Sequence, residues 1–254
     1  YVNNEVGAIE PIAEASRVVK AKNPHAVVHT DAVQAAGMLD INIDTLGVDL
    51  LSLAAHKFYG PKGVGALYVR PRTPMQWQQL GGSQEKNRRA GTENVAGAVG
   101  MAKAIELACD EFDPRNAHYR ELRDKLLSGI PERVPFVHIT VPTPAHPEVS
   151  KGHPEALEGR AAAESRADPR IANNASFCFE YLEGEAVLMA LDLAGVAASS
   201  GSACTSGSLE PSHVLTAMGI PEDLARGSMR LTVGHGNTPE QIDYVLDTLP
   251  DTVS

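Results

Sequence analysis

The most informative segment of the sequence is Ala-His-Lys-Phe-Tyr-Gly-Pro-Lys-Gly-Val-Gly at positions 55–65. It directly follows the apolar run at 48–55, which suits a strand buried on both faces, and it leads into a Gly/Pro turn. Lys57 therefore comes at the end of a buried strand, where loss of solvent favours the neutral, nucleophilic form of an amine. The alternative is a surface lysine in a turn, and the long, specific flanking string argues against it.

The neighbouring sequence predicts an α/β domain around this stretch. Short apolar runs at 26–30 and 64–69 suit two further buried strands, and apolar residues recur at helical spacing over 9–22, with Pro11 in the first turn. Such strands alternating with helices favour a mostly parallel sheet. Two more helices are expected at 95–107 and 117–127.

The rest of the chain predicts a second, smaller domain. We expect part of an α/β domain at 1–95, linking helices at 96–130 and a small α+β domain at 131–254. Residues 141–170 carry prolines among charged and small residues and predict an exposed, mobile insertion. The elements expected after it are strands at 174–180 and 227–233 and helices at 183–193 and 239–249.

Composition excludes several classes of function. The 254 residues are 43% hydrophobic, enough for a core, and their formal net charge of -10 would repel nucleic acid and anionic lipid. The most apolar stretch, 186–198, is interrupted by Asp192 and is shorter than the roughly 20 apolar residues of a membrane helix. We therefore expect neither nucleic-acid binding nor a membrane span.

The three cysteines favour a reducing, cytoplasmic location, because they are too few and too scattered for a disulfide framework. Cys204 lies in a run of Ser, Gly and Ala, which suits a nucleophile on a mobile loop. Cys109, on a helix face, and Cys178, within a strand, are better interpreted as small core residues. The chain begins with Tyr1 rather than Met, so we also expect that its front is missing.

Asp31 ends another apolar run, and the carboxyl edge of an α/β sheet is where ligands collect. A pyridoxal phosphate ring needs a carboxylate on its nitrogen to remain protonated, and Asp31 fits that role. The alternative for Asp31 is the N-cap of a helix that starts at Ala32. Gln34, one helical turn on, either faces the same cleft or is an exposed amide.

Five strings in order resemble the cysteine desulfurases of the nitrogen-fixation and housekeeping iron–sulfur type, within the class V aminotransferases. They are Val-Asn-Asn-Glu-Val-Gly at 2–7, His-Thr-Asp-Ala-Val-Gln at 29–34, Ala-His-Lys-Phe-Tyr-Gly-Pro-Lys-Gly at 55–63, Arg-Arg-Ala-Gly-Thr-Glu-Asn at 88–94 and Ser-Ser-Gly-Ser-Ala-Cys-Thr-Ser-Gly at 199–207. The resemblance covers nearly the whole chain apart from the insertion. It implies a fold-type I homodimer that uses pyridoxal phosphate to turn L-cysteine into L-alanine and an enzyme-bound persulfide.

The resemblance also implies a role for each residue of a cofactor site. Lys57 would form the Schiff base with the cofactor, Asp31 would pair with the pyridine nitrogen, and Gln34 would donate to the ring hydroxyl. His56 would bind the cofactor phosphate. Thr92 would reach the phosphate in the neighbouring subunit.

Three further residues would act on the substrate. Asn4 would contact the ring hydroxyl region and the substrate carboxylate, and the planar guanidinium of Arg230 would clamp that carboxylate. A surface ion pair is the alternative for Arg230. Cys204 would attack the substrate sulfur and pass the persulfide to an iron–sulfur scaffold or another acceptor. No metal of its own is implied, although Cys204 could ligate an iron–sulfur cluster transiently with a partner.

The chain departs from the family pattern in two ways. Ala54 replaces a serine that contacts the cofactor phosphate in most relatives, and the preceding segment with the phosphate-binding helix and the ring-stacking histidine is not found in these residues. The chain alone is therefore expected to have an incomplete cofactor site. Two alternatives remain: a selenocysteine lyase or another class V relative, and a non-catalytic remnant that serves dimerisation or partner binding.

Overall fold

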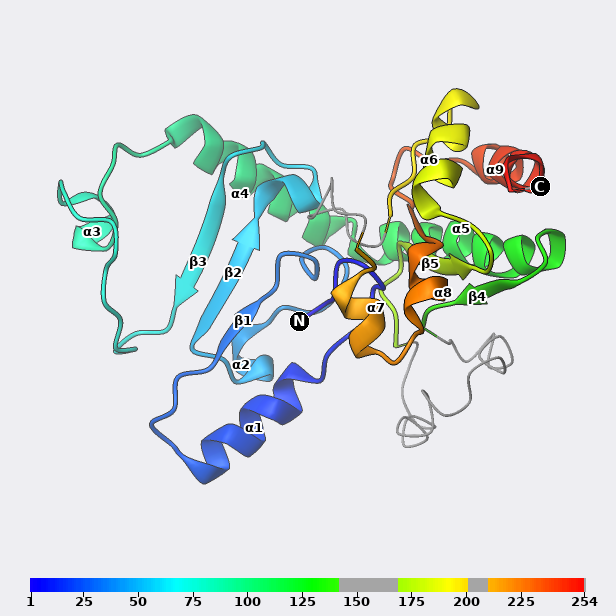
Figure 1. The fold of residues 1–254 in the computed structure, drawn as a ribbon. Coiled ribbons are helices and arrows are strands. Elements are labelled where there is room, and N and C mark those ends of the chain that lie inside the picture. The colour runs from blue at the N-terminus through cyan, green and yellow to red at the C-terminus, as the bar shows by residue number, and fades with distance from the viewer. Residues whose placement is uncertain (142–168, 201–209, 254) are drawn as a thin grey trace. The chain divides into compact units, whose positions relative to one another are not determined.

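The computed structural model describes residues 1–141, 169–200 and 210–253, which form two compact units (Figure 1). The first unit contains residues 1–2 and 10–112, and the second contains residues 3–9 and 113–254. Nearly all of the insertion expected at 141–170 lies outside the described residues, so its exposure and mobility stay a prediction. No helix within the described ranges is both long and apolar enough to cross a membrane.

A three-stranded sheet in the order β1-β2-β3 organises the first unit. β1 and β2 are parallel, because the chain between them is long enough to include helix α2 and return to the same edge. β3 pairs antiparallel with β2, because only a short turn separates the two strands. The elements of this unit are α1 (Ile12–Lys22), β1 (His29–Asp31), α2 (Ile43–Leu46), β2 (Leu50–Ala54), the 3-10 helix η1 (Ala55–Phe58), β3 (Gly65–Val69), α3 (Gln84–Asn87) and α4 (Val95–Asp110).

Helix α4 packs against η1, the turn that follows β2 (Figure 1). Ala104 and Ala108 of α4 share a buried cluster with Ala55 and Phe58 of η1. Alanine side chains allow the two backbones to approach closely, so the position of η1 is fixed by packing. At the other end of the unit, α1 begins at Ile12 with Pro11 as its N-cap, slightly later than the sequence pattern indicated.

The second unit is built on an antiparallel sheet in the order β4-β5-β6, which confirms the small α+β domain. All six residues of the central strand β5 are buried. Helix α6 packs against α9 and β6, and α8 packs against β5. The elements of this unit are α5 (Phe112–Arg133), β4 (Val137–Ile139), β5 (Asn174–Phe179), α6 (Gly184–Leu193), α7 (His213–Ala217), α8 (Glu222–Arg226), β6 (Ser228–Thr232) and α9 (Pro239–Thr252).

Local signals explain where several helices begin. Thr238 and Gln241 form a capping box at the start of α9, with Pro239 in the first turn, where its missing N–H costs nothing. Asn42 caps α2 by accepting hydrogen bonds from the N–H groups of Asp44 and Thr45. Of the two helices expected at 96–130, α4 lies in the first unit and α5 belongs to the second from Asp113 onward.

Residues Asn3–Ile9 leave the first unit and join the second. Ile9 N–H donates to the carbonyl of Pro169 at 2.9 Å, and Ile171 N–H donates to the carbonyl of Gly7 at 3.0 Å. Val6 is buried in an apolar cluster that includes Leu215 of α7. Residues 3–9 therefore belong to the second unit, although the residues on both sides of them belong to the first.

Candidate active site

One group of predicted site residues lies at the edge of the first unit where β1 and β2 both end. Asp31 is opposite Ser52 in the parallel register, and the N–H of Ala32 donates to the carbonyl of Ser52 at 3.0 Å. Two residues after Ser52, β2 ends and η1 begins with Ala55. Asp31 and the η1 residues His56 and Lys57 therefore come to the same edge of the sheet, as the sequence predicted.

The turn that carries Lys57 is held by its buried residues. Ala55 and Phe58 are buried, whereas His56 and Lys57 between them are exposed. The N–H of Gly60 donates to the carbonyl of Ala55 at 2.8 Å and closes the turn. The described part of this chain therefore presents Lys57 to solvent, and the expectation that the chain itself shields this amine is wrong for these residues.

Gly60 is needed at its position because there is no room for a side chain. A Cβ on Gly60 would lie 2.8 Å from the Cβ and 2.9 Å from the carbonyl oxygen of Ala55, closer than van der Waals contact. We expect Gly60→Ala to lower the free energy of unfolding by about 1–3 kcal/mol. Thermal unfolding measures this loss, and Gly236→Ala, where nothing lies within 4 Å of the added Cβ, is the control. Equal melting temperatures for the two variants would contradict the prediction.

Asp31 keeps part of its carboxylate available. Its Oδ1 accepts a hydrogen bond from the N–H of Val33 at 2.8 Å, and Asp31 itself is exposed. Residues 32–38 form turns rather than the helix that the capping alternative required, although Asp31 does cap the first of these turns. Gln34 is half-buried in this segment. Within the described ranges, Oδ2 of Asp31 has no hydrogen-bond partner, so it could accept a further N–H.

Thr92 lies on the surface of the first unit, directly before α4. It is exposed, and its neighbour Asn94 caps α4 by accepting from the N–H of Gly97 at 3.0 Å. Val95 and Val99, one helical turn apart on α4, have exposed fractions of 67% and 64%. An apolar strip on a helix is thus exposed beside Thr92.

Two other predicted site residues, Asn4 and Arg230, lie in the second unit. Arg230 is on β6, and its Nη1 donates to the carbonyl oxygen of Asn4 at 2.6 Å. Both residues are half-buried. The structure thus brings together the two residues predicted to contact a substrate carboxylate.

The comparisons with known proteins show the family of the chain. The model of the aminotransferase class-V family matches residues 1–151 and 154–245. The chain belongs to this family. Family members are pyridoxal-phosphate-dependent enzymes, and the cofactor requirement that the sequence implied is confirmed at that level.

Several relatives of this class-V chain are described as cysteine desulfurases. It is 48% identical to "Cysteine desulfurase IscS" of Dictyoglomus turgidum over 98% of the chain and 57% of the relative. It is 42% identical to "Cysteine desulfurase NifS" of Azotobacter vinelandii over 100% of the chain and 57% of the relative. A solved "NIFS-LIKE PROTEIN" superposes with a TM-score of 0.81 at 34% identity and covers 99% of the chain, which spans 59% of that structure. The chain thus spans less than two thirds of the proteins it resembles.

The described residues fit the cofactor chemically. An exposed amine and an exposed carboxylate at one sheet edge are the two groups that a carbonyl-bearing pyridine ring requires. Ala54, the last residue of β2, has no hydroxyl group. Its side chain therefore cannot donate a hydrogen bond to a phosphate.

The two described cysteines differ in burial, and only one of them is the core residue that the sequence predicted. Cys178 is buried in β5, and burial raises the pKa of its thiol to about 12, which confirms a structural role. Cys109 is exposed at the end of α4, so its assignment as a core residue is wrong. The apolar spacing over α4 predicts a helix, but it does not tell whether the face that carries Cys109 is covered by other elements. Cys204 lies outside the described residues, and its role stays a prediction.

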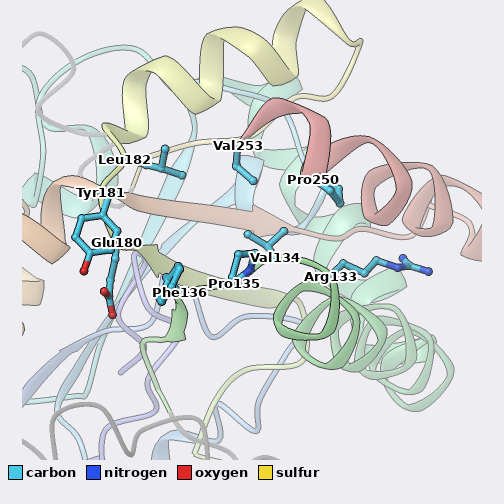
Figure 2. A pocket seen from close by; sticks show the side chains of 9 residues that line it. All are labelled: Arg133, Val134, Pro135, Phe136, Glu180, Tyr181, Leu182, Pro250 and Val253. Carbon is cyan, nitrogen blue, oxygen red and sulfur yellow. The ribbon is translucent and has the colours of Figure 1, made fainter.

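One pocket of the class-V chain lies in the second unit, and no predicted site residue is part of its lining. It has a volume of about 260 Å³ and is lined by Arg133, Val134, Pro135, Phe136, Glu180, Tyr181, Leu182, Pro250 and Val253 (Figure 2). Phe136 and Tyr181 meet edge to face, with ring centroids 5.9 Å apart. All nine residues belong to the second unit.

Sequence reasoning missed the residues that hold Asn4 in place. Glu5 and Ser212 are buried and hydrogen-bonded to each other, and Asn174 Nδ2 donates to the carbonyl of Glu5 at 3.2 Å. Glu5 belongs to the string at 2–7 that also contains Asn4, so the sequence did offer a signal for Glu5. Its partner Ser212 is 207 residues away in the sequence, and no local pattern links the two.

Proposed function

We propose that the protein is a cysteine desulfurase that converts L-cysteine into L-alanine and keeps the sulfur as a persulfide on Cys204. The observation that carries this proposal is the shared sheet edge of Asp31 and Lys57 in a class-V chain. The relatives described as cysteine desulfurases and the contact between Asn4 and Arg230 support it.

Several predicted site residues lie in the first unit, and each has a proposed role. Pyridoxal phosphate supplies an electron sink when bound, and Lys57 holds it covalently and then moves the α-proton of the substrate. Asp31 keeps a proton on the pyridine nitrogen, and Gln34 donates to the ring hydroxyl. His56 binds the phosphate, beside the position where Ala54 offers no hydroxyl.

The remaining tasks concern the substrate and its sulfur. Arg230 and Asn4 orient the α-carboxylate, since a guanidinium can donate two parallel hydrogen bonds to it. The thiolate of Cys204 attacks the substrate Sγ, and the bond between Cβ and Sγ breaks. The carbon keeps the electron pair and takes up a proton to become the methyl group of alanine, and the sulfur stays on Cys204 as a persulfide.

We propose a homodimer, because Thr92 is expected to reach the cofactor phosphate of a second copy. The exposed valines of α4 beside Thr92 support this, since large apolar side chains on a surface are commonly covered by a partner. The persulfide then passes to an iron–sulfur scaffold or another sulfur acceptor, where Cys204 could also contact an iron–sulfur cluster as cargo. A cytoplasmic location fits the reduced thiol that this chemistry requires.

The test is the reaction itself, run with the protein that the complete gene encodes. With pyridoxal phosphate, a dithiol reductant and L-cysteine, we expect alanine and sulfide in equal amounts, measured by amino-acid analysis and a sulfide assay. Faster turnover of L-selenocysteine, with no alanine from L-cysteine, would favour the selenocysteine lyase alternative. A colourless protein that yields no alanine from either substrate would favour the non-catalytic remnant.

A further inference from the structure

The buried carboxylate of Glu5 is unusual for its surroundings. Glu5 is 5% exposed and adjoins Val6, which lies in an apolar cluster with Leu215 and Leu224. Within the described ranges, no lysine, arginine or histidine pairs with it, and its side chain bonds only to the hydroxyl of Ser212. Burial of a carboxylate costs several kcal/mol, and one neutral hydroxyl offsets only part of that cost. Packing alone would be served better by an apolar residue.

Ser212 uses its whole hydrogen-bonding capacity in this arrangement. Its hydroxyl donates to Oε2 of Glu5 and accepts from the N–H groups of Val214 at 3.2 Å and Leu215 at 3.3 Å, at the start of α7. Ser212 is 3% exposed. A serine hydroxyl has one proton and two lone pairs, so its orientation is fully determined by these partners. The carboxylate of Glu5 is thereby tied to the backbone of α7.

Hydrogen bonds hold the main chain at Glu5 and at Asn4, the neighbouring residue predicted to bind substrate. Glu5 N–H donates to Oδ1 of Asn3 at 2.9 Å, and the carbonyl of Glu5 accepts from Nδ2 of Asn174 at 3.2 Å. One residue earlier, the carbonyl of Asn4 accepts from Nη1 of Arg230 at 2.6 Å. The direction of the Arg230 guanidinium therefore depends on the position of the Asn4 carbonyl, which in turn depends on Glu5.

We propose that Glu5 and Ser212 are positioning residues for substrate binding. Their hydrogen bond fixes the carbonyl of Asn4, and through it the guanidinium of Arg230, in the orientation that receives the α-carboxylate of the amino-acid substrate. This inference rests on the proposed function, which supplies that substrate. Neither residue touches the substrate, so both act through Asn4 and Arg230.

The first test separates binding from chemistry. Because Asn4 and Arg230 would hold the carboxylate both before and during the reaction, we expect Glu5→Ala to raise KM for L-cysteine about tenfold with kcat within about twofold. Glu5→Gln keeps an oxygen that accepts from Ser212 and should stay within about threefold of the parent KM. If the two residues act through one bond, Ser212→Ala should add almost nothing in the Glu5→Ala background.

The matched control is Ser16→Ala, which removes another buried hydroxyl, bonded to the carbonyl of Gly47 in the first unit. It should lower the melting temperature without changing KM. An unchanged KM in Glu5→Ala, or an equal rise in Ser16→Ala, would overturn the inference. If Glu5→Ala does not fold, Ser212→Ala takes its place, with Ser212→Thr as the variant that restores the hydroxyl.

A second measurement does not need activity. Phenylglyoxal modifies free guanidinium groups, and mass spectrometry of the peptide that contains Arg230 gives the rate of modification. We expect Glu5→Ala to speed this reaction several-fold, whereas Glu5→Gln and Ser16→Ala leave it unchanged. Equal rates in the parent and in Glu5→Ala would refute the coupling even if the protein proved to have no desulfurase activity. Failure of the proposed function is seen separately, in the parent protein alone.

Discussion

Lys57→Ala is expected to abolish alanine release from L-cysteine, with a loss of at least about 10³-fold, because the variant lacks both the covalent attachment of the cofactor and the base for the α-proton. It should also lose the visible absorbance that bound pyridoxal phosphate gives the parent. Ultraviolet–visible spectra and alanine analysis of the same preparations measure the two effects together.

Lys62→Ala is the matched control for this prediction. Lys62 is another exposed lysine of the same string, five residues further on, and it is outside η1. Its replacement removes the same positive charge from the same surface, so it should keep both the absorbance and most of the activity. A Lys57→Ala protein that remained yellow and released alanine at the parent rate would show that another amine carries the chemistry.

Cys204→Ala should stop sulfur transfer while leaving cofactor binding intact. We expect turnover to fall about 10³-fold or more, because the variant lacks the thiolate proposed to attack the substrate sulfur. Cys178 is buried, and its thiol, with a pKa raised to about 12, remains protonated at neutral pH. Persulfide formation is measured as a mass increase of one sulfur atom on the peptide that contains Cys204.

Cys109→Ala is the control, since Cys109 is the exposed cysteine of the described residues. It should retain parent turnover and the parent absorbance spectrum. If Cys204→Ala still mobilised sulfur and Cys109→Ala did not, the nucleophile would be Cys109. The two single variants therefore distinguish Cys204 from Cys109 as the nucleophile.

The sequence predicted the part of the site that depends on local order. An apolar run followed by Ala-His-Lys and a Gly/Pro turn was enough to place Lys57 after a strand, and the parallel pairing of two such runs placed Asp31 at the same edge. These features follow from a few neighbouring residues. β3 differs from the mostly parallel sheet that the sequence predicted, because the chain between β2 and β3 is too short for a crossover and the two strands pair antiparallel.

What the sequence did not predict depends on residues far apart in the chain. The exposure of Lys57 and Cys109 is decided by which faces other elements cover, and apolar spacing along one helix or strand carries no such information. The hydrogen bond between Glu5 and Ser212 spans 207 residues, and that between Arg230 and Asn4 spans 226. Helical and strand periodicities describe one element at a time, so such pairs come only from the structure.

The early passage of Asn3–Ile9 into the second unit has a consequence for synthesis on the ribosome. Asn4 is translated 226 residues before Arg230, its partner in β6. At about 5–20 residues per second, the two meet only after an interval on the order of ten to forty-five seconds. During that time Val6 lacks the apolar partners Leu215 and Leu224 that bury it in the folded second unit. Residues 3–9 therefore remain open to chaperones and proteases until the end of the second unit has been made.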